Sequence, residues 1–351
     1  MIHSMMRTVV CAFALLACEP TRAADKIAWP PELPVYDHIV IVIEENKDFE
    51  QILGSRLDAP YLRQLAAEGA VIDRMHGEEH FSQGNYFWLF SGSNHNVGFS
   101  DQVPSAANHP DYPFTAGNLG HQLIANGRSF KGYSEDLPAI GSNAEFDPPG
   151  CQGASCIYAR KHVPWISFSN VPNGTTVDTS SNLRLADFPA DYAELPTVSF
   201  VVPNLENDMH NGQPATSIPA GDMWLRKNLD GYYHWAKTHN SLLIITFDEN
   251  DDRGRYQGLT NPMVTPSTQY PPPDRYDELL HDLRNRILTI FAGARIKPGV
   301  YSEGKGITHV NLLRTIEAMY GLPKSGAQQP NAAGAGISDE TIVTDIFAPL
   351  R

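Results

Sequence analysis

The sequence predicts an α/β fold whose sheet is mostly parallel and is covered by helices on both faces. Two apolar runs of strand length, at 38–43 and 241–247, are strand signals. Segments with helical spacing separate these and further apolar runs, and such alternation is typical of a parallel sheet with helices packed on each side. The 351 residues, 42% of them hydrophobic, are enough to bury a large core.

The first half of the chain alternates between strands and helices. Over 59–69, Leu62 and Leu65 have helical spacing, and Gly69 lies where a helix stop is expected. The predicted elements around this helix are, in order, a strand at 38–43, a strand at 71–72, helices at 83–90 and 118–126, and a strand at 129–133.

The second half continues the same alternation. Its predicted elements are a strand at 197–202, a helix at 222–237, strands at 241–247 and 287–291, and a helix at 309–320. No internal repeat is present in the sequence, so a repeat architecture is not expected.

Two long irregular stretches interrupt this pattern. Residues 139–190 are rich in Gly, Pro, Ser and Asn without sustained periodicity, which indicates an excursion from the core rather than a linker between domains. Residues 253–286 form a second insertion, directly after an acidic segment, where it would form one wall of a site. We therefore expect a single domain over 24–351 with these two insertions.

The net charge of the chain restricts its partners. At −14, it disfavours a broad attraction to nucleic acid or to an anionic membrane, because both need clustered Lys and Arg. An anionic substrate would need local positive charge, for example from a bound metal ion.

The N-terminus predicts a secretory signal peptide over 1–23. Arg7 precedes an apolar stretch at 9–17, and small residues lead to an exit at Ala23. The apolar stretch is shorter than the roughly 20 residues that span a bilayer, so no transmembrane segment is expected. The predicted location is periplasmic or secreted. The alternative is a lipid anchor on Cys18, which follows a weak lipoprotein box.

Beyond this segment the chain has two cysteines, Cys151 and Cys156. In an oxidising compartment they predict a small disulfide loop. A metal finger is not expected, because no further Cys or matching His pair lies nearby in the sequence.

Acidic and amide residues follow two of the predicted strands. Glu45-Asn46 comes after the strand at 38–43, and Asp248-Glu249 comes after the strand at 241–247. In open α/β sheets ligands bind beyond the carboxyl ends of strands, so these side chains can converge. Their oxygen atoms suit a hard divalent cation such as Ca²⁺, Mg²⁺ or Mn²⁺. The alternatives are a turn or helix cap at Glu45-Asn46 and a solvated acidic loop after Phe247.

Three further residues are candidates for chemistry. Ser82, at the start of a predicted helix, is either an N-cap or a nucleophile placed where helix N–H groups hold phosphate. Serine needs a metal ion or a base to act at neutral pH. His210 follows the strand at 197–202 and is either a proton donor or a surface histidine. His309, at the start of the last helix, is either a ligand or a neighbour of the cap.

Read together, these segments resemble the phosphoesterase family that contains bacterial acid phosphatases and phospholipases C. The resemblance lies in five blocks, which occur in the family's order: Glu45 to Gly54, Ser82 to Gly92, Pro203 to His210, Thr246 to Glu249, and His309 to Glu317. It implies an alkaline-phosphatase-like fold, a three-layer α/β/α sandwich.

The resemblance also implies roles for individual residues. It makes Ser82 the residue that accepts the phosphoryl group and His210 the general acid. The metal-binding set that it implies is Glu45, Asn46, Ser82, Asp248 and Glu249. Candidates for contacts to the substrate or for support of these groups are His80, Asn85, Asp208 and His309.

The sequence departs from the family pattern in two places. Phe81 and Gly84 stand on either side of Ser82-Gln83, where the family often has prolines. Asn250-Asp251-Asp252 follows Asp248-Glu249 where the phospholipase branch commonly has His-Gly-Gly, and this second departure favours the phosphatase branch. We therefore expect a metal-dependent acid phosphatase acting on small phosphate monoesters. The alternatives are a phospholipase C or another phosphodiesterase and, from another class, an exported calcium-binding protein without catalysis.

Overall fold

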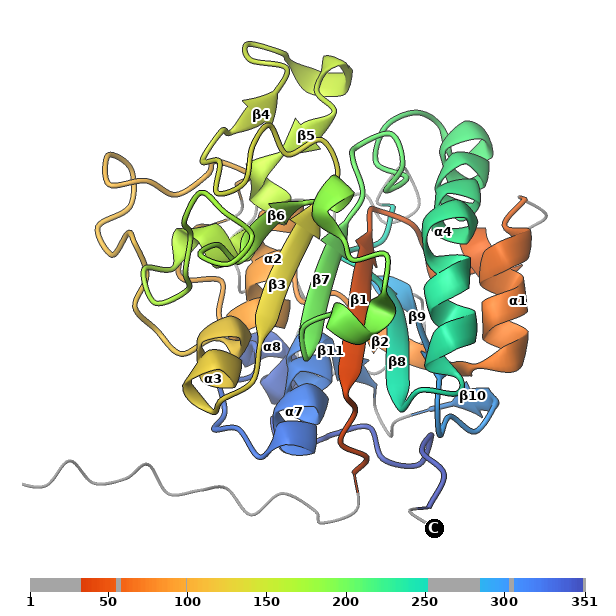
Figure 1. Ribbon diagram of the computed structural model, residues 1–351. Helices are drawn as coiled ribbons and strands as arrows, with labels where there is room; N and C mark the ends of the chain where they lie inside the picture. Colours follow the sequence, from red (N-terminus) through yellow and green to blue (C-terminus); the bar gives the residue numbers. More distant parts are fainter. Residues whose placement is uncertain (1–32, 55–57, 99, 252–284, 303–305, 350–351) are drawn as a thin grey trace, which may run out of the picture.

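The computed structural model describes residues 33–54, 58–98, 100–251, 285–302 and 306–349 (Figure 1). The predicted signal peptide and nearly all of the predicted insertion at 253–286 lie outside these ranges. Within them, the main sheet has the strand order β10-β2-β9-β8-β1-β7-β3-β6, with β11 paired to β2. Its strands are β1 (His38–Glu44), β2 (Ala70–His76), β3 (Phe130–Ser134), β6 (Asn182–Arg184), β7 (Val198–Val202), β8 (Ser241–Phe247), β9 (Arg286–Gly293), β10 (Gly299–Tyr301) and β11 (Ile307–Thr308).

The central strand β1 pairs in parallel with β7 on one side and with β8 on the other. The strand β9 is antiparallel to both of its neighbours, β8 and β2, and the remaining pairings in this sheet are parallel. Residues 39–43 are almost fully buried, as expected for a strand covered on both faces. The mostly parallel α/β sheet predicted from the sequence is confirmed.

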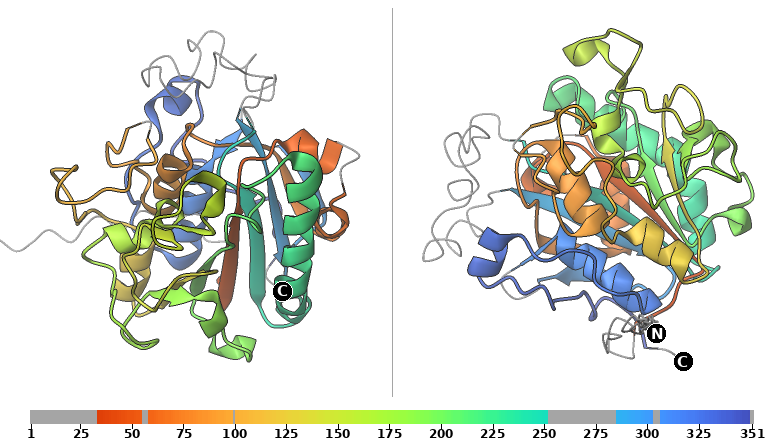
Figure 2. Two further views of the ribbon diagram at one scale, coloured as in Figure 1. Left: turned by 90° about the horizontal axis from the view of Figure 1, so that it is seen from above. Right: turned by 90° about the vertical axis from the view of Figure 1, so that its left-hand side faces the viewer.

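Helices cover both faces of the sheet (Figures 1 and 2). On one face α1 packs against α4, and both contact strands of the sheet; on the other, α2, α3 and α7 contact one another. The helices are α1 (Pro60–Glu68), α2 (Ser82–Ser91), α3 (Leu119–Ala125), α4 (Pro214–Ala236), α7 (His309–Tyr320) and α8 (Pro330–Gly334). This arrangement gives the three layers of an α/β/α sandwich.

The helix α4 begins at Pro214, eight residues before the predicted start at 222. Aspartate is a common N-cap residue, so the sequence suggests a helix start at Asp222. In the structure Asp222 lies within α4, and its carboxylate caps the start of α1. Its two oxygens accept hydrogen bonds from the backbone N–H groups of Tyr61 (3.0 Å) and Leu62 (2.8 Å) in α1. The residue before α1, Ala59, has no side chain that could cap it, so Asp222 satisfies these donors instead.

The irregular stretch at 139–190 is tied to the main sheet. It carries a small antiparallel pair, β4 (Phe146–Asp147) and β5 (Tyr158–Ala159), and the disulfide between Cys151 and Cys156, as predicted. Trp165 is buried against the backbone of Gly132 in β3, where an added Cβ would lie 2.1 Å from its ring. Near its end lies β6, the edge strand beside β3.

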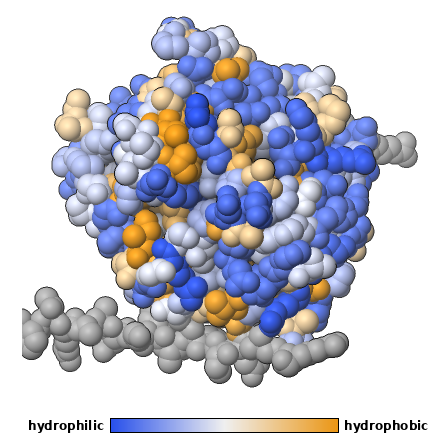
Figure 3. All heavy atoms as spheres, in the orientation of Figure 1, coloured by the Kyte–Doolittle hydropathy of each residue, from blue (hydrophilic) through white to orange (hydrophobic). Residues whose placement is uncertain are grey.

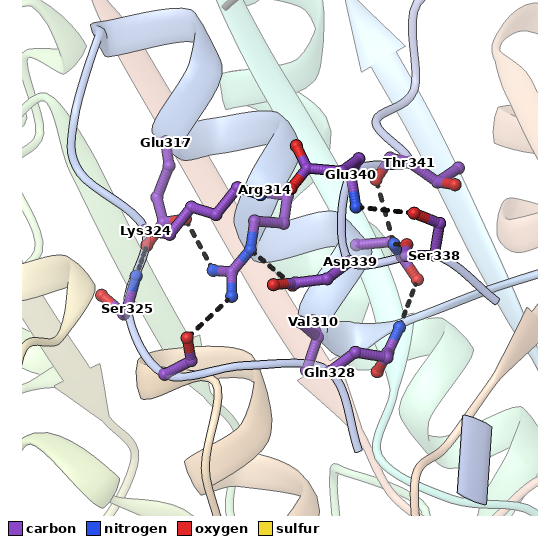
Figure 4. Close-up of polar contacts among 12 residues, drawn as sticks. Val310, Arg314, Glu317, Lys324, Ser325, Gln328, Ser338, Asp339, Glu340 and Thr341 are labelled. Atoms are coloured by element: carbon purple, nitrogen blue, oxygen red, sulfur yellow. Dashed lines mark hydrogen bonds and ion pairs between the residues drawn. The ribbon is translucent and has the colours of Figure 1, made fainter. Parts of the chain in front are cut away.

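The helix α7 is fixed to the C-terminal segment by a buried charge cluster (Figure 4). Arg314 is fully buried and pairs with Glu317 (2.7 Å) and Asp339 (2.8 Å). Glu317 also accepts the backbone N–H of Ser325 at 2.7 Å. Because a buried ammonium or guanidinium needs a partner for its charge, this cluster ties the segment after α7 to the core.

The face of the molecule in Figure 3 is predominantly hydrophilic, with apolar residues in small separate patches. Among the described residues, no helix is both long enough and apolar enough to cross a membrane.

Candidate active site

The two acidic pairs lie side by side because their strands are neighbours. Glu44 at the end of β1 is paired in register with Phe247 at the end of β8. The backbone N–H of Asn46 donates to Asp248 Oδ1 (3.1 Å), and Asn46 Nδ2 donates to Glu249 Oε1 (3.0 Å). The convergence that the sequence predicted for these strand ends is present in the structure.

Ser82 is the first residue of α2, and its side chain points to the acidic pairs. Its Oγ donates a hydrogen bond to Glu45 Oε2 at 2.8 Å. The N-cap of α2 is Phe81, which has no capping side chain and a φ of 76°, in the left-handed region that aromatic residues rarely adopt. Ser82 is therefore not the N-cap, and its hydroxyl is directed to Glu45.

A third strand end contributes Asp208 and His210, which follow β7. The ligand atoms of Glu45, Asp208 and His162 lie within 4.8 Å of one another, and all three residues are buried. His162 Nε2 is 3.1 Å from Glu45 Oε1, and its Nδ1 is 3.6 Å from Asp208 Oδ2. The ring of His162 stacks on Tyr86 with centroids 4.9 Å apart.

Sequence reasoning missed His162. It lies in a 3₁₀ turn, Arg160–His162, within the irregular stretch, and no strand end or helical spacing marks it. Its position depends on how that stretch packs on the sheet, which local sequence does not specify.

His210 lies beside this group. Its backbone N–H donates to Asp208 Oδ1 at 2.8 Å, and its ring Nδ1 is 3.1 Å from Asn211 Oδ1. Its ring centroid is 6.1 Å from that of His162. Burial and the nearby Lys161 lower the pKa of His210 to about 4.

His80 and Asn85 support the site from the segment before α2 and its first turn. His80 Nδ1 contacts Glu249 Oε2 at 3.1 Å. Asn85 Oδ1 accepts the backbone N–H groups of Glu78 (3.0 Å) and Glu79 (3.1 Å), which fixes the turn that leads into Ser82.

Both ring nitrogens of His309 contact protein atoms next to the site. Its Nδ1 contacts Glu78 Oε2 at 2.6 Å, and its Nε2 contacts the carbonyl of Phe247 at 2.9 Å. With both ring nitrogens engaged by protein atoms, His309 anchors the start of α7 to the end of β8.

Lys47 joins two of the loops that form the site. Its buried Nζ donates to the carbonyls of Asn46 (2.9 Å) and Met209 (2.8 Å). Both Asn46 and Met209 have positive φ, 46° and 75°. The lysine therefore stabilises two tight turns, one after β1 and one after β7.

The carboxylates are unusually buried. Glu45, Asp208 and Asp248 are each at most 1% exposed, and burial raises the pKa of all three. Asp248 raises the pKa of Glu45 and Asp208 further by repulsion. Burial lowers the pKa of His162 well below its usual range, which favours a neutral imidazole that can donate a lone pair.

These donors fit a divalent cation. The buried Asn46 Oδ1 and Asp208 Oδ2 accept no hydrogen bond from any residue that the structure describes. Buried polar atoms without partners are costly, and carboxylates this close repel one another unless positive charge lies between them. Oxygen donors with one neutral imidazole are ligands that such an ion takes.

A sequence profile of the Phosphoesterase family matches residues 55–323. This chain belongs to the Phosphoesterase family. It is 40% identical over 294 residues to a phosphatidylinositol-3-phosphatase of Mycobacterium tuberculosis, with 84% of this chain and 80% of that protein covered. It is 25% identical to a phosphate-repressible acid phosphatase of Penicillium chrysogenum over 83% of this chain and 60% of that protein. The phosphoesterase is thus a phosphoric ester hydrolase, as predicted.

Solved structures show the same fold at low sequence identity. A protein of the alkaline phosphatase superfamily from Vibrio parahaemolyticus matches with a TM-score of 0.52 and 11% identity, covering 90% of this chain and 75% of that one. The predicted alkaline-phosphatase-like fold class is confirmed by this likeness, which concerns the fold alone.

Proposed function

We propose that this phosphoesterase is a metal-dependent acid phosphatase that hydrolyses phosphate monoesters through a phosphoserine on Ser82. The observation that carries the proposal is the 2.8 Å hydrogen bond from Ser82 Oγ to Glu45, at a helix start surrounded by buried oxygen donors. The names of its relatives, a phosphatidylinositol phosphatase and acid phosphatases, favour a monoester substrate.

The residues that would hold the cation are those implied by the family resemblance. They are Glu45, Asn46, Ser82, Asp248 and Glu249, and the group around Glu45 adds His162 and Asp208. When bound, a divalent cation would lower the pKa of the Ser82 hydroxyl and offset the charge of the phosphate.

The chain's own residues then supply positioning and proton transfer. Glu45 Oε2, which accepts the hydrogen bond of Ser82, is the acceptor for the hydroxyl proton. Ser82 Oγ attacks phosphorus in line, the bond from phosphorus to the ester oxygen breaks, and that oxygen keeps the electron pair. Water then attacks phosphorus, the bond from phosphorus to Ser82 Oγ breaks, and Oγ regains its proton from Glu45, which releases phosphate and restores Ser82.

His210 is the proposed donor of the proton to the departing oxygen. Its pKa of about 4 in the free protein means that little of it is charged at mildly acidic pH. A bound phosphate dianion would raise this pKa, because a nearby negative charge favours the imidazolium. Protonation of His210 would thus accompany substrate binding.

Export is also part of the proposal. The predicted signal peptide at 1–23 and the alternative lipid anchor at Cys18 lie outside the described residues. The disulfide in the 139–190 stretch is the kind of bond that persists in an oxidising compartment, which supports a periplasmic or secreted location.

Hydrolysis of p-nitrophenyl phosphate by the purified protein tests the proposed activity. Ser82→Ala should lower kcat by at least about a thousandfold, since the proposed nucleophile is lost, with an unchanged thermal midpoint. Removal of metal by a chelator should abolish turnover of the unmodified protein, and added divalent cation should restore it. Normal turnover by Ser82→Ala would exclude the proposed nucleophile, and faster hydrolysis of phosphatidylcholine than of the monoester would favour the phospholipase alternative.

A further inference from the structure

Lys161, the residue before His162, has a role that neither the sequence motifs nor the proposed reaction assigns. Its side chain is 11% exposed, and its Nζ pairs with Asp101 Oδ2 at 2.7 Å. Within the described part of the chain, Nζ makes no other hydrogen bond. An ammonium group carries three donors, so two of them are available to a ligand.

Asp101 ties this ammonium group to the helix that carries Ser82. Its other oxygen, Oδ1, accepts the backbone N–H of Gln83, the residue after Ser82, at 3.2 Å. Gln83 Nε2 in turn donates to the carbonyls of Ser100 (3.2 Å) and Gln102 (3.0 Å), which fixes the loop on either side of Asp101. Lys161 Nζ is therefore anchored beside the first turn of α2.

The charge of Lys161 lies beside the candidate active site. Lys161 directly precedes His162, whose Nε2 is 3.1 Å from Oε1 of Glu45, the carboxylate that accepts the hydrogen bond of Ser82. Among the described residues its ion-pair partner is Asp101, so the charge lies near the nucleophile while two of its donors have no partner. A fixed cation with unused donors near a nucleophile suits an anionic ligand.

We propose that Lys161 binds a non-bridging oxygen of the substrate phosphate and that Asp101 positions it. This inference rests on the proposed phosphatase function. The N–H groups at the start of α2, a helix of ten residues, add positive potential on the same side. A monoester dianion has one more negative charge than a diester, so Lys161 should favour monoesters and contribute to substrate selection.

The test compares Lys161→Met with the unmodified full-length protein on two substrates, p-nitrophenyl phosphate and bis(p-nitrophenyl) phosphate. The kcat/KM for the monoester should fall about 100-fold, the size of effect seen when one donor to a reacting oxyanion is removed. The kcat/KM for the diester should fall much less. Lys161→Arg should recover part of the monoester activity, because it keeps the charge.

Calorimetric titration with inorganic phosphate gives a second readout that does not depend on turnover. Lys161→Met should weaken phosphate binding at least about tenfold, and Asp101→Asn should weaken it by a smaller factor, since the lysine loses its tether. The matched control is Lys237→Met. Lys237 also pairs with a carboxylate, Glu68, at 3.0 Å, but it lies at the end of α4, where it should affect neither measurement.

The outcomes separate this proposal from the proposed function. Equal losses on both substrates with unchanged phosphate affinity would overturn the assignment of Lys161 and leave it a structural residue. If the unmodified protein hydrolyses neither substrate, the proposed function fails, and the phosphate titration still decides on Lys161. If Lys161→Met does not fold, Asp101→Asn decides by the same titration, and unchanged phosphate affinity in that variant would contradict the proposal.

Discussion

At the scale of single residues, burial controls how the histidines titrate. His95, in the turn after α2, stacks on Phe114 with ring centroids 4.4 Å apart, and its Nε2 is 2.8 Å from Ser91 Oγ. Burial lowers its pKa to about 4, from an ordinary value of 6.5. Between these two pH values the unfolded chain takes up a proton that the folded protein does not bind.

Because the folded pKa of His95 is depressed, its contribution to stability falls as the pH drops from 6.5 toward 4. His95→Gln removes this titration and keeps a side chain that can bond to Ser91. Between pH 6.5 and 4.5, the unmodified protein should lose about 1–2 kcal/mol more of its unfolding free energy than the variant does. Urea unfolding at the two pH values measures this, and equal losses would show that His95 does not carry this pH dependence.

Single residues also mark the limit of sequence reasoning. Glu45 and Asp248 could be predicted because each follows an apolar strand, and Ser82 because it begins a helix within a family motif. His162 and Lys161 could not, because they lie in an irregular turn whose position is fixed by tertiary packing. Tertiary packing decides where such residues lie, and the hydrophobic periodicity of the sequence does not reveal this packing.

At the scale of elements, the start of one helix is capped by a side chain of another helix. The sequence around α1 offers a stop at Gly69 but no cap at its start, and the missing cap comes from Asp222, far along the chain in α4. The predicted start of α4 is therefore wrong by eight residues, because Asp222 is a typical N-cap residue although it lies within the helix. The strand predicted at 71–72 extends over 70–76 in the structure, and the other predicted strands and helices lie within two residues of their observed bounds.

Asp222→Ala should destabilise the protein by about 1–3 kcal/mol, because it leaves the N–H groups of Tyr61 and Leu62 buried without acceptors. Chemical denaturation measures the change. Asp222→Asn, which keeps one acceptor oxygen, should lose less. A loss below about 0.5 kcal/mol for the alanine variant would show that water or another group replaces the carboxylate.

At the scale of the whole molecule, the sheet brings distant chain segments to one place. The ends of β1, β7 and β8 are adjacent because these strands are neighbours in parallel, and α2 and the 139–190 stretch complete the site from one side. The packing of Trp165 on Gly132 and the pairing of β6 with β3 hold that stretch on the sheet. Several carboxylates at this place, among them Glu45, Asp208 and Asp248, are buried instead of solvated.

The central claim is that this convergence makes Ser82 the group that receives the phosphoryl from the substrate. Rapid acid quench of the protein during turnover of p-nitrophenyl phosphate, followed by mass spectrometry of its peptides, tests this most directly. The account predicts a peptide that gains the mass of one phosphoryl group on Ser82, and no such gain in Ser82→Ala. Phosphorylation of a different residue, or rapid turnover with no phosphorylated peptide at any quench time, would contradict it.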